Sequence, residues 1–307
     1  MNKIKVIFDT DPGVDDAMAL LFLYYAPEIE LIGITTTHGN GTIATTTHNA
    51  LYLTERFGID LPVAQGSGAP LAGAAADPPV FVHGHNGLGD IPLPQNIAKK
   101  TDSRPAYRFI IDMVRAHAQE VAIVAVGPLT TLALALRNDP EIAGLVRRLV
   151  IMGGAFGHHG HLGNVTPAAE ANILSDPHAA DETLGGSWPI TMVGLDVTQQ
   201  TLMTTEFLKT SPRREVRPAD SFGKLRASTR PSTIQPVVPA FTSTIRARSP
   251  ISSIRPCSPH DLAQSASSQR VWRSAKRSRN PTVTGFGPVH GMATHPMPSA
   301  RTSIRKS

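Results

Sequence analysis

The first 210 residues of this 307-residue chain predict an α/β fold with an open, mostly parallel, Rossmann-like sheet and helices on both faces. Short apolar runs alternate with helical patterns at least five times between residues 4 and 197, which is typical of βαβ units. Polar residues follow most of these runs, at the strand ends where open α/β sheets bind ligands. We therefore expect one domain over residues 1–210, with a sizeable core.

The first apolar run, residues 4–8, predicts a buried strand, and residues 17–25 predict an apolar helix. Between them the string Asp9-Thr10-Asp11-Pro12-Gly13-Val14-Asp15-Asp16 places four carboxylates within eight residues, with a turn at its Pro-Gly step. Crowded carboxylates repel one another unless protons or a cation neutralise them, and oxygen ligands favour Ca²⁺ or Mg²⁺. Helix capping would explain one or two of the four. Asp15 and Asp16 point about 100° apart on a helix, so one can face a metal and the other a substrate hydroxyl.

Further strands in the predicted sheet end in polar or glycine-rich segments. Residues 29–37 are followed by His38-Gly39-Asn40, and residues 121–126 are followed by Gly127-Pro128-Leu129-Thr130, which predicts a turn and a helix start. A glycine-rich loop, residues 83–89, contains two histidines in a spacing more typical of a flexible surface element than of a metal site.

The second half of the predicted domain continues the pattern. Residues 149–154 predict a strand and turn, and residues 190–196 predict a strand that ends in Asp196. Between them Gly163-Asn164 is followed by Glu170-Ala171-Asn172, which runs into Asp176-Pro177. Alone, the Glu-Ala-Asn segment is equally consistent with the first turn of a surface helix.

Together these strings resemble the inosine-uridine preferring nucleoside hydrolase family over about residues 4–210. The resemblance implies an enzyme that hydrolyses the N-glycosidic bond of ribonucleosides to ribose and free base, with Ca²⁺ as cofactor. It implies that Asp11, Asp16 and the main-chain carbonyl of Val126 bind the metal, and that Asp11 is the general base. Asp9 is expected to support the metal ligands, and His83 to lie on a mobile loop beside the site. The residues expected to bind the sugar are Asp15, Asn40, Asn164, Glu170 and Asn172.

Two other function classes remain open from the sequence. Asp9-Thr10-Asp11 also fits the start of the Asp-nucleophile phosphatase pattern, although the residues that follow do not continue it. The third possibility is a non-catalytic protein whose basic tail binds nucleic acid. Release of sugar from nucleosides that stops when EDTA is added would indicate a nucleosidase. Hydrolysis of a phosphate ester that depends on Mg²⁺ would indicate a phosphatase. An affinity for nucleic acid that falls with salt concentration would indicate a nucleic-acid-binding protein.

The composition changes near residue 210. Residues 1–210 carry a net charge of −9, and residues 211–307 carry +14 in a setting rich in Ser, Arg, Pro and Thr. Such a tail is typical of a disordered basic segment, and it lacks a nucleic-acid-binding motif, so nucleic acid is not an expected partner. We favour a third interpretation, an out-of-frame translation that begins near residues 209–211 and leaves the C-terminal third non-native.

Two tail segments support the frameshift interpretation. Residues 225–233 can derive from DNA whose shifted frame encodes Pro-Arg-Phe-Tyr-Pro-Ala-Phe-Tyr, and residues 241–247 from DNA that encodes His-Leu-His-Asp-Ser-Ser-Ala. The family has a His-Asp pair here, with the His beside the leaving base and the Asp on the metal. As written, residues 243–246 contain neither, and whether His260-Asp261 replaces the pair stays open. We therefore expect weak or no activity and poor solubility for the chain as written.

The remaining features concern location and assembly. The single cysteine, Cys257, excludes an internal disulfide. The sequence contains neither a signal peptide nor a transmembrane run, which predicts a cytoplasmic protein without a membrane partner. The resemblance implies a small-molecule nucleoside as partner and a homodimer or homotetramer. The preference for purine or pyrimidine nucleosides stays open, because in the family the base contacts come largely from the region that does not match here.

Overall fold

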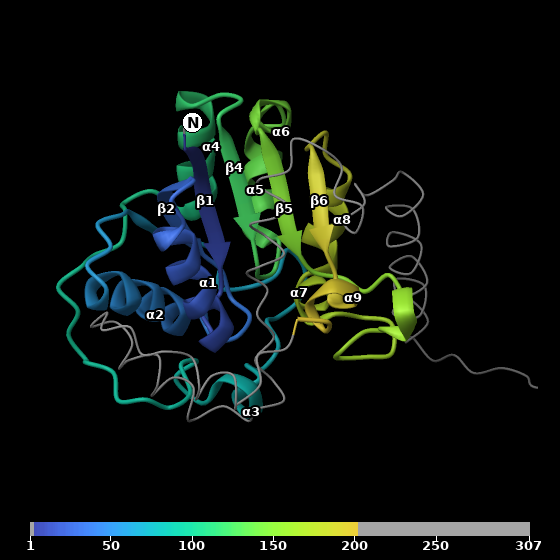
Figure 1. Cartoon of the computed structure of the whole chain (residues 1–307), viewed down its shortest axis with the longest axis horizontal. Coiled ribbons are helices and arrows are strands. Elements are labelled where there is room, and N and C mark those ends of the chain that lie inside the picture. The colour runs from blue at the N-terminus through green and yellow to red at the C-terminus, as the bar shows by residue number, and fades with distance from the viewer. Residues whose placement is uncertain (1–2, 202–307) are drawn as a thin grey trace, which may run out of the picture. The chain divides into compact units, whose positions relative to one another are not determined.

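Six parallel strands form one sheet in the computed structural model, which describes residues 3–201 (Figure 1). The strands are β1 (Ile4–Thr10), β2 (Ile29–Thr36), β3 (Val63–Gln65), β4 (Val121–Ala125), β5 (Arg148–Met152) and β6 (Ile190–Val193). Their spatial order is β3-β2-β1-β4-β5-β6, and each neighbouring pair is parallel. The predicted open Rossmann-like sheet is confirmed for the described residues. The order reverses between β1 and β4, which places the ligand crevice of this fold class beyond the ends of those two strands.

Helices cover both faces of the sheet, as predicted. They are α1 (Val14–Tyr25), α2 (Ile43–Arg56), α3 (Val80–His83), α4 (Ala106–Ala116), α5 (Thr130–Asn138), α6 (Ile142–Leu145), α7 (Ala171–Ser175), α8 (Pro177–Leu184) and α9 (Leu195–Thr198), with a 3₁₀ turn η1 (His158–Gly160). None of the helices in the described part of the chain combines the length and the apolar character that a membrane span requires.

Side chains alternate across the sheet and so create two hydrophobic clusters. From β1, Val6 and Phe8 join the cluster that contains the buried residues of α1 and α2, while Ile7 joins the cluster that contains those of α4 and α5. Because successive strand residues point to opposite faces, a strand that is apolar throughout must be covered on both sides. This explains why residues 4–8 form a continuous apolar run rather than an alternating one.

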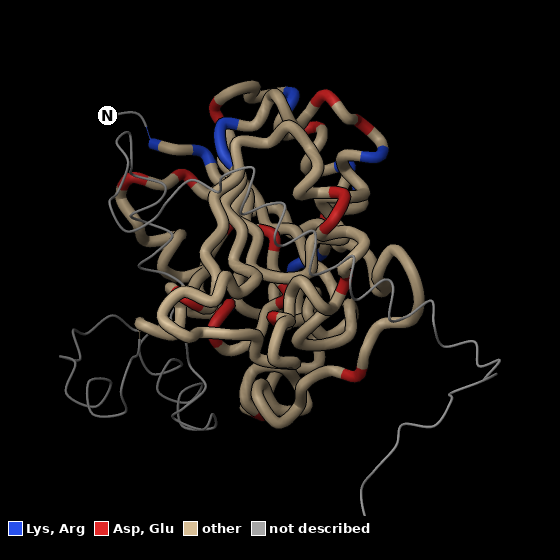
Figure 2. Tube along the Cα trace, turned by 90° about the vertical axis from the view of Figure 1, so that its right-hand side faces the viewer, with Lys and Arg blue, Asp and Glu red and all other residues tan. Residues whose placement is uncertain are grey.

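Charged residues are distributed unevenly along the strand direction. The arrowheads of β1, β4, β5 and β6 point to the lower end of the molecule in Figure 1. In Figure 2 the described Lys and Arg residues lie mainly in the upper half, whereas Asp and Glu residues occur in both halves. The carboxyl ends of the strands therefore carry acidic residues with few basic ones nearby.

One strand is shorter than predicted. β6 ends at Val193, and Asp196 lies in the first turn of α9, so the prediction of a strand through residue 196 is wrong. The apolar run continues past the strand because Leu195 is also fully buried, as a helical residue of the core. The expected non-native C-terminal third lies outside the described residues.

Candidate active site

Asp11 lies just beyond the end of β1 and is 1% exposed. Its Oδ2 accepts a hydrogen bond from the Asn40 main-chain N–H at 2.8 Å, and its Oδ1 is buried without a hydrogen-bond partner. Two glycines enclose this carboxylate. A Cβ atom at Gly39 would overlap Oδ2, and one at Gly127 would lie 2.7 Å from Oδ1. The loops after β2 and β4 can approach Asp11 this closely only because both positions lack a side chain.

Asp16 lies in the first turn of α1 and accepts three hydrogen bonds. The Thr10 hydroxyl donates to Oδ1 at 2.7 Å, and the Gly13 N–H donates to Oδ2 at 3.0 Å. The side-chain amide of Asn40 also donates to Oδ2, at 2.9 Å. Asn40 thus donates to Asp11 through its main chain and to Asp16 through its side chain, so one residue positions both predicted metal ligands.

Asp15 occupies the more open side of the same turn, with 32% of its side chain exposed. Its Oδ1 is 3.8 Å from Nδ1 of His83, which accepts a hydrogen bond from the Val14 N–H at 3.3 Å. Burial lowers the pKa of His83, and an accepting Nδ1 is unprotonated, so this contact joins a carboxylate to a neutral ring. The expected surface position of this histidine is wrong: His83 is buried at the end of α3, beside Asp15, where its ring packs over the backbone turn at Gly13.

Asp9 is fully buried near the end of β1. Its Oδ1 accepts a hydrogen bond from the Thr35 hydroxyl at 2.5 Å, and the Thr131 hydroxyl also interacts with this carboxyl group. Its carbonyl accepts the Val126 N–H at 2.9 Å. The side chain of Asp9 thus contacts β2 and the start of α5 rather than another carboxylate, and its main chain is joined to the end of β4.

Burial raises the pKa of each of these four carboxyl groups. The pKa of Asp9 rises to about 7 by desolvation alone, and that of Asp16 to about 7 by desolvation and then by the charge of Asp15. Desolvation and then the charge of Asp16 raise the pKa of Asp11 well above its ordinary value. Among the described residues, the one basic side chain paired with these carboxyl groups is His83. The group therefore lacks compensating positive charge from the described part of the protein.

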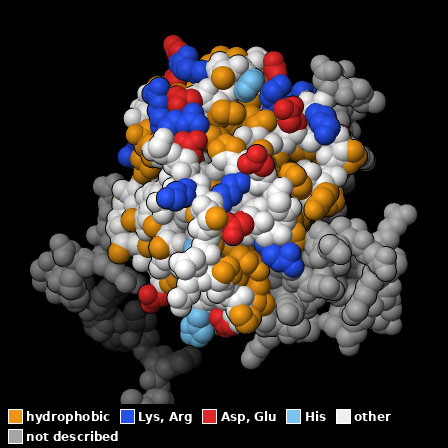
Figure 3. Space-filling model, turned by 90° about the vertical axis from the view of Figure 1, so that its left-hand side faces the viewer, with side chains coloured by type: hydrophobic (Ala, Val, Ile, Leu, Met, Phe, Trp, Pro, Cys, Tyr) orange, Lys and Arg blue, Asp and Glu red, His pale blue; other side chains and the backbone are white. Residues whose placement is uncertain are grey.

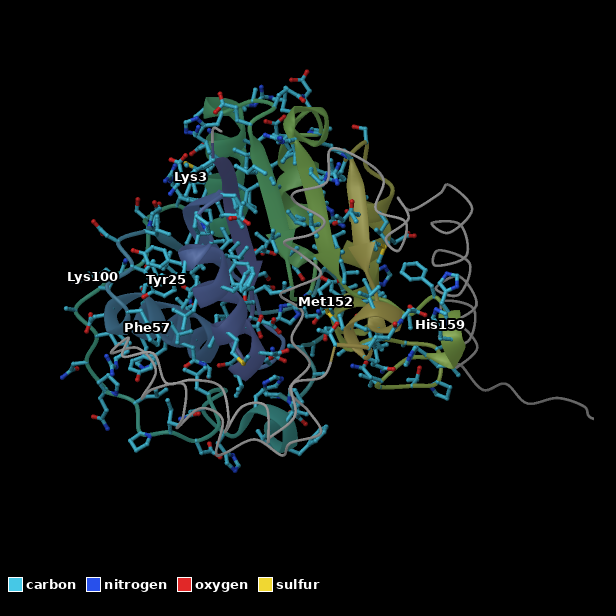
Figure 4. The ribbon with its side chains drawn as sticks, viewed as in Figure 1. Lys3, Tyr25, Phe57, Lys100, Met152 and His159 are labelled. Carbon is cyan, nitrogen blue, oxygen red and sulfur yellow. The ribbon has the colours of Figure 1, made fainter. Side chains whose placement is uncertain are left out.

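The end of β4 meets the start of α7 at Asn172. The side-chain amide of Asn172 donates to the Val126 carbonyl at 2.8 Å and to the Met152 carbonyl at 3.1 Å. Met152 ends β5 and is labelled at the lower end of that strand in Figure 4. One side chain therefore fixes the carbonyl groups at the ends of two adjacent strands. The carbonyl of Val126, the third predicted metal ligand, retains one lone pair for another partner.

Glu170 is buried and caps α7. Its two carboxylate oxygens accept the main-chain N–H groups of Asn172 at 3.0 Å, Ile173 at 3.1 Å and Gly154 at 3.0 Å. Asn164 is exposed, and its Oδ1 accepts the Ala171 N–H at 3.0 Å. Both predicted sugar-binding residues thus hold the start of α7 in the described structure, and the surface-helix interpretation of Glu170 does not agree with its burial.

The predicted residues form two adjoining groups. The first surrounds the start of α1 and the second surrounds the start of α7; Gly127, which follows Val126, touches Asp11 and joins them. The members of the first group are Asp9, Asp11, Asp15, Asp16, Asn40 and His83, and those of the second are Val126, Asn164, Glu170 and Asn172. Sequence reasoning missed the contribution of Thr10, whose only signal was a hydroxyl between two aspartates.

The residues around Asp11 supply some, but not all, of the oxygen ligands that a hard cation such as Ca²⁺ requires. No group of three or more His, Cys, Asp or Glu side chains among residues 3–201 has the arrangement of a metal site. The donors available there are the carboxylates of Asp11 and Asp16 and the Val126 carbonyl, all oxygen atoms of the kind that Ca²⁺ prefers. The buried, unpartnered Oδ1 of Asp11 and the raised carboxyl pKa values fit a cation bound at this point.

Comparisons with known proteins show the family to which the chain is similar. The family model described as inosine-uridine preferring nucleoside hydrolase matches residues 6–284, past residue 210, where we expected the resemblance to end. The chain is 47% identical to uridine nucleosidase 1 of Arabidopsis thaliana over 205 residues, which cover 66% of this chain and 60% of that protein. It is 41% identical to the inosine-uridine preferring nucleoside hydrolase of Crithidia fasciculata over 217 residues, which cover 70% of this chain and 67% of that protein. The match thus spans about three-fifths of the length of the plant relative.

Solved structures show the same similarity. A plant nucleoside hydrolase superimposes with a TM-score of 0.68 and 39% identity over 73% of this chain and 70% of its own. A purine-preferring ribonucleoside hydrolase from Gardnerella vaginalis superimposes with a TM-score of 0.71 and 34% identity, over 83% of this chain and 85% of its own. The chain therefore belongs to the inosine-uridine preferring nucleoside hydrolase family.

Proposed function

We propose that this chain carries the reaction of its family, the hydrolysis of the N-glycosidic bond of a ribonucleoside to ribose and free base. The observation that carries this proposal is the pair of buried carboxylates, Asp11 and Asp16, which Asn40 bridges at the topological switch point of the sheet. A group of carboxylates of this kind suits a reaction in which positive charge develops on the sugar ring.

We propose Ca²⁺ as the cofactor, held by Asp11, Asp16 and the Val126 carbonyl. These three groups leave most of the six to eight oxygen positions of Ca²⁺ to other donors, such as water and the hydroxyl groups of the sugar. When bound, the ion would lower the pKa of an adjacent water molecule.

Asp11 would remove a proton from the attacking water. Its Oδ2 is already fixed by the Asn40 N–H, so Oδ1 would serve both roles of Asp11, with one lone pair toward the cation and the other toward the attacking water. The neighbouring carboxylates of Asp15 and Asp16 would stabilise the oxocarbenium-like transition state, and the burial of Asp16 strengthens its electrostatic interactions. Asp9 would support this arrangement through its contacts with β2 and β4.

We propose that the sugar hydroxyls bind to Asp15, Asn40, Asn164, Glu170 and Asn172. Asp15 is the most accessible carboxylate of the α1 turn, which suits contact with a substrate. Asn164 uses its Oδ1 on α7, so its NH₂ group is the part that would reach a hydroxyl. The His83 ring beside Asp15 would border the same pocket.

The other parts of this proposal come from the sequence. We propose a homodimer or homotetramer in the cytoplasm and weak activity for the chain as written, because a frameshift near residues 209–211 would remove the family's His-Asp pair. Across the face in Figure 3, described Lys and Arg side chains are interspersed with Asp and Glu, without the continuous basic patch that binds nucleic acid.

The test is sugar release from inosine and uridine by two proteins, the chain as written and the chain encoded after the frame is restored near codons 209–211. We expect release by the restored chain, its loss with EDTA, and a decrease of at least about 10²-fold in Asp11→Asn. Asp102→Asn is the matched control, because Asp102 lies beside the edge strand β3, and its carboxylate accepts hydrogen bonds from Arg104 rather than from residues of the proposed site. A restored, folded chain that releases no sugar, or full activity in Asp11→Asn, would overturn the proposal.

A further inference from the structure

Asp176 is a fully buried carboxylate at the junction of α7 and α8 that makes more contacts than a helix cap requires. Its Oδ1 accepts the Ala179 N–H at 3.0 Å, which is the usual capping bond. Its Oδ2 accepts the Leu71 N–H at 2.8 Å and the Thr130 hydroxyl at 2.7 Å. One oxygen therefore caps α8, while the other joins two loops that are distant in sequence.

The Thr130 contact completes a clamp around the turn that follows β4. Asn172 donates to the carbonyl of Val126, and four residues later Asp176 accepts from the hydroxyl of Thr130. Residues 172 and 176 thus hold both ends of the turn formed by residues 126–130. This turn carries the Val126 carbonyl and also Gly127, whose backbone abuts the Asp11 carboxylate.

The Leu71 contact ties a third segment to the same oxygen. Leu71 lies in the loop after β3, along the chain that leads to α3 and His83. The oxygen thus connects the β3 loop, the β4 turn and the α7–α8 junction, three of the segments beyond the strand ends. Because Asp176 is excluded from solvent, these charge-assisted hydrogen bonds are not exchanged for bonds to water.

We infer that Asp176 is a positioning residue that acts through Thr130 to hold the Val126 carbonyl and Gly127 in place against Asp11. The inference rests on the proposed function, in which that carbonyl binds Ca²⁺. Asp176 touches neither the proposed metal ligands nor the proposed sugar-binding side chains directly. Partner groups of this kind typically change metal affinity or activity by about 10- to 100-fold when they are removed.

The test removes the hydrogen bond between Thr130 and Asp176 but leaves the bond by which Asp176 caps α8. In the full chain, Thr130→Val deletes the hydroxyl and keeps both main-chain bonds of Asp176, and Thr130→Ser restores the hydroxyl. Thr54→Val is the matched control, because Thr54 is also a buried threonine, and its hydroxyl bonds only within α2. The readouts are Ca²⁺ affinity by titration calorimetry with the metal alone, and deuterium uptake of peptides that cover residues 126–131.

We expect Thr130→Val to weaken Ca²⁺ binding by about 10- to 100-fold and to increase deuterium uptake in residues 126–131. We expect Thr130→Ser to bind like the unaltered chain, and Thr54→Val to change stability alone. Unchanged uptake in Thr130→Val, or equal effects in Thr54→Val, would overturn the inference. If the unaltered chain binds no Ca²⁺, the metal proposal fails for the chain as written, and the uptake measurement alone decides whether the Thr130–Asp176 contact holds the turn.

Discussion

The substitution Asp9→Asn tests whether burial of this carboxyl group opposes folding. Asp9 is fully buried, and its pKa is raised to about 7 from an ordinary value of 3.8 because desolvation disfavours the charged form. An asparagine keeps an oxygen for the Thr35 hydroxyl. Its NH₂ group would replace the other oxygen, and it can donate to the hydroxyl oxygen of Thr131, which interacts with the Asp9 carboxylate in the unaltered chain.

The magnitude follows from proton linkage. Between pH 5 and about 7, folded Asp9 keeps a proton that the unfolded chain has released, so the stability contributed by this group falls as the pH rises. The loss is about 1.4 kcal/mol per pH unit, or about 3 kcal/mol over two units, and it stops above the folded pKa. Asp9→Asn lacks this loss, so its unfolding free energy relative to the unaltered chain should increase by about 3 kcal/mol from pH 5 to pH 8.

The assay is urea unfolding of the Ca²⁺-free protein at both pH values, with EDTA present. Asp102→Asn is the control, because hydrogen bonds from Arg104 lower the pKa of Asp102 to about 2 and the group is ionised at both pH values in either state. Its effect on stability should therefore be the same at pH 5 and pH 8. A difference between Asp9→Asn and the unaltered chain that does not change with pH would refute the reasoning.

Two further predictions concern the proposed metal site. Gly39→Ala should lower the affinity for Ca²⁺ and reduce sugar release by about 10²-fold, because the new Cβ overlaps Asp11 Oδ2 and the backbone at φ +148° disfavours a side chain. Calorimetry and a reducing-sugar assay would measure both effects, and unchanged Ca²⁺ affinity would contradict the geometry. Ca²⁺ affinity should also fall by at least about tenfold per pH unit below about 7, because Asp16, with its pKa raised to about 7, must lose a proton to bind, and the pKa of Asp11 is raised as well. Calorimetry at pH 6, 7 and 8 would check this, and a constant affinity would show that Ca²⁺ binding does not require Asp16 to lose a proton in this range.

Much of the fold could be predicted from the sequence because its signals are local. The continuous apolar run of β1 requires cover on both faces, and the string from Asp9 to Asp16 places four carboxylates at one strand end whatever the rest of the chain does. The predicted strand continues past residue 193 because Leu195 is also apolar, although it belongs to a helix. A short apolar run does not distinguish a strand from a buried helical turn.

The burial of His83 was not predicted for a related reason. A glycine-rich loop with two histidines has no periodicity that reveals which ring faces inward, and only packing against the turn at Gly13 decides it. Likewise, the Asp176-Pro177 step is a readable helix-start signal, but nothing in it indicates which loops the second carboxylate oxygen will meet.

The sequence by itself determined the sheet, the acidic turn and the family resemblance, because hydrophobic periodicity and short motifs act over a few residues. The tertiary structure alone decided that Asn40 joins Asp11 to Asp16, that Asn172 fixes the Val126 carbonyl, and that Glu170 caps α7. The first two connect residues that are 24 to 46 positions apart. Such contacts depend on the strand order β3-β2-β1-β4-β5-β6, which brings the ends of β1 and β4 together, and no local pattern encodes that order.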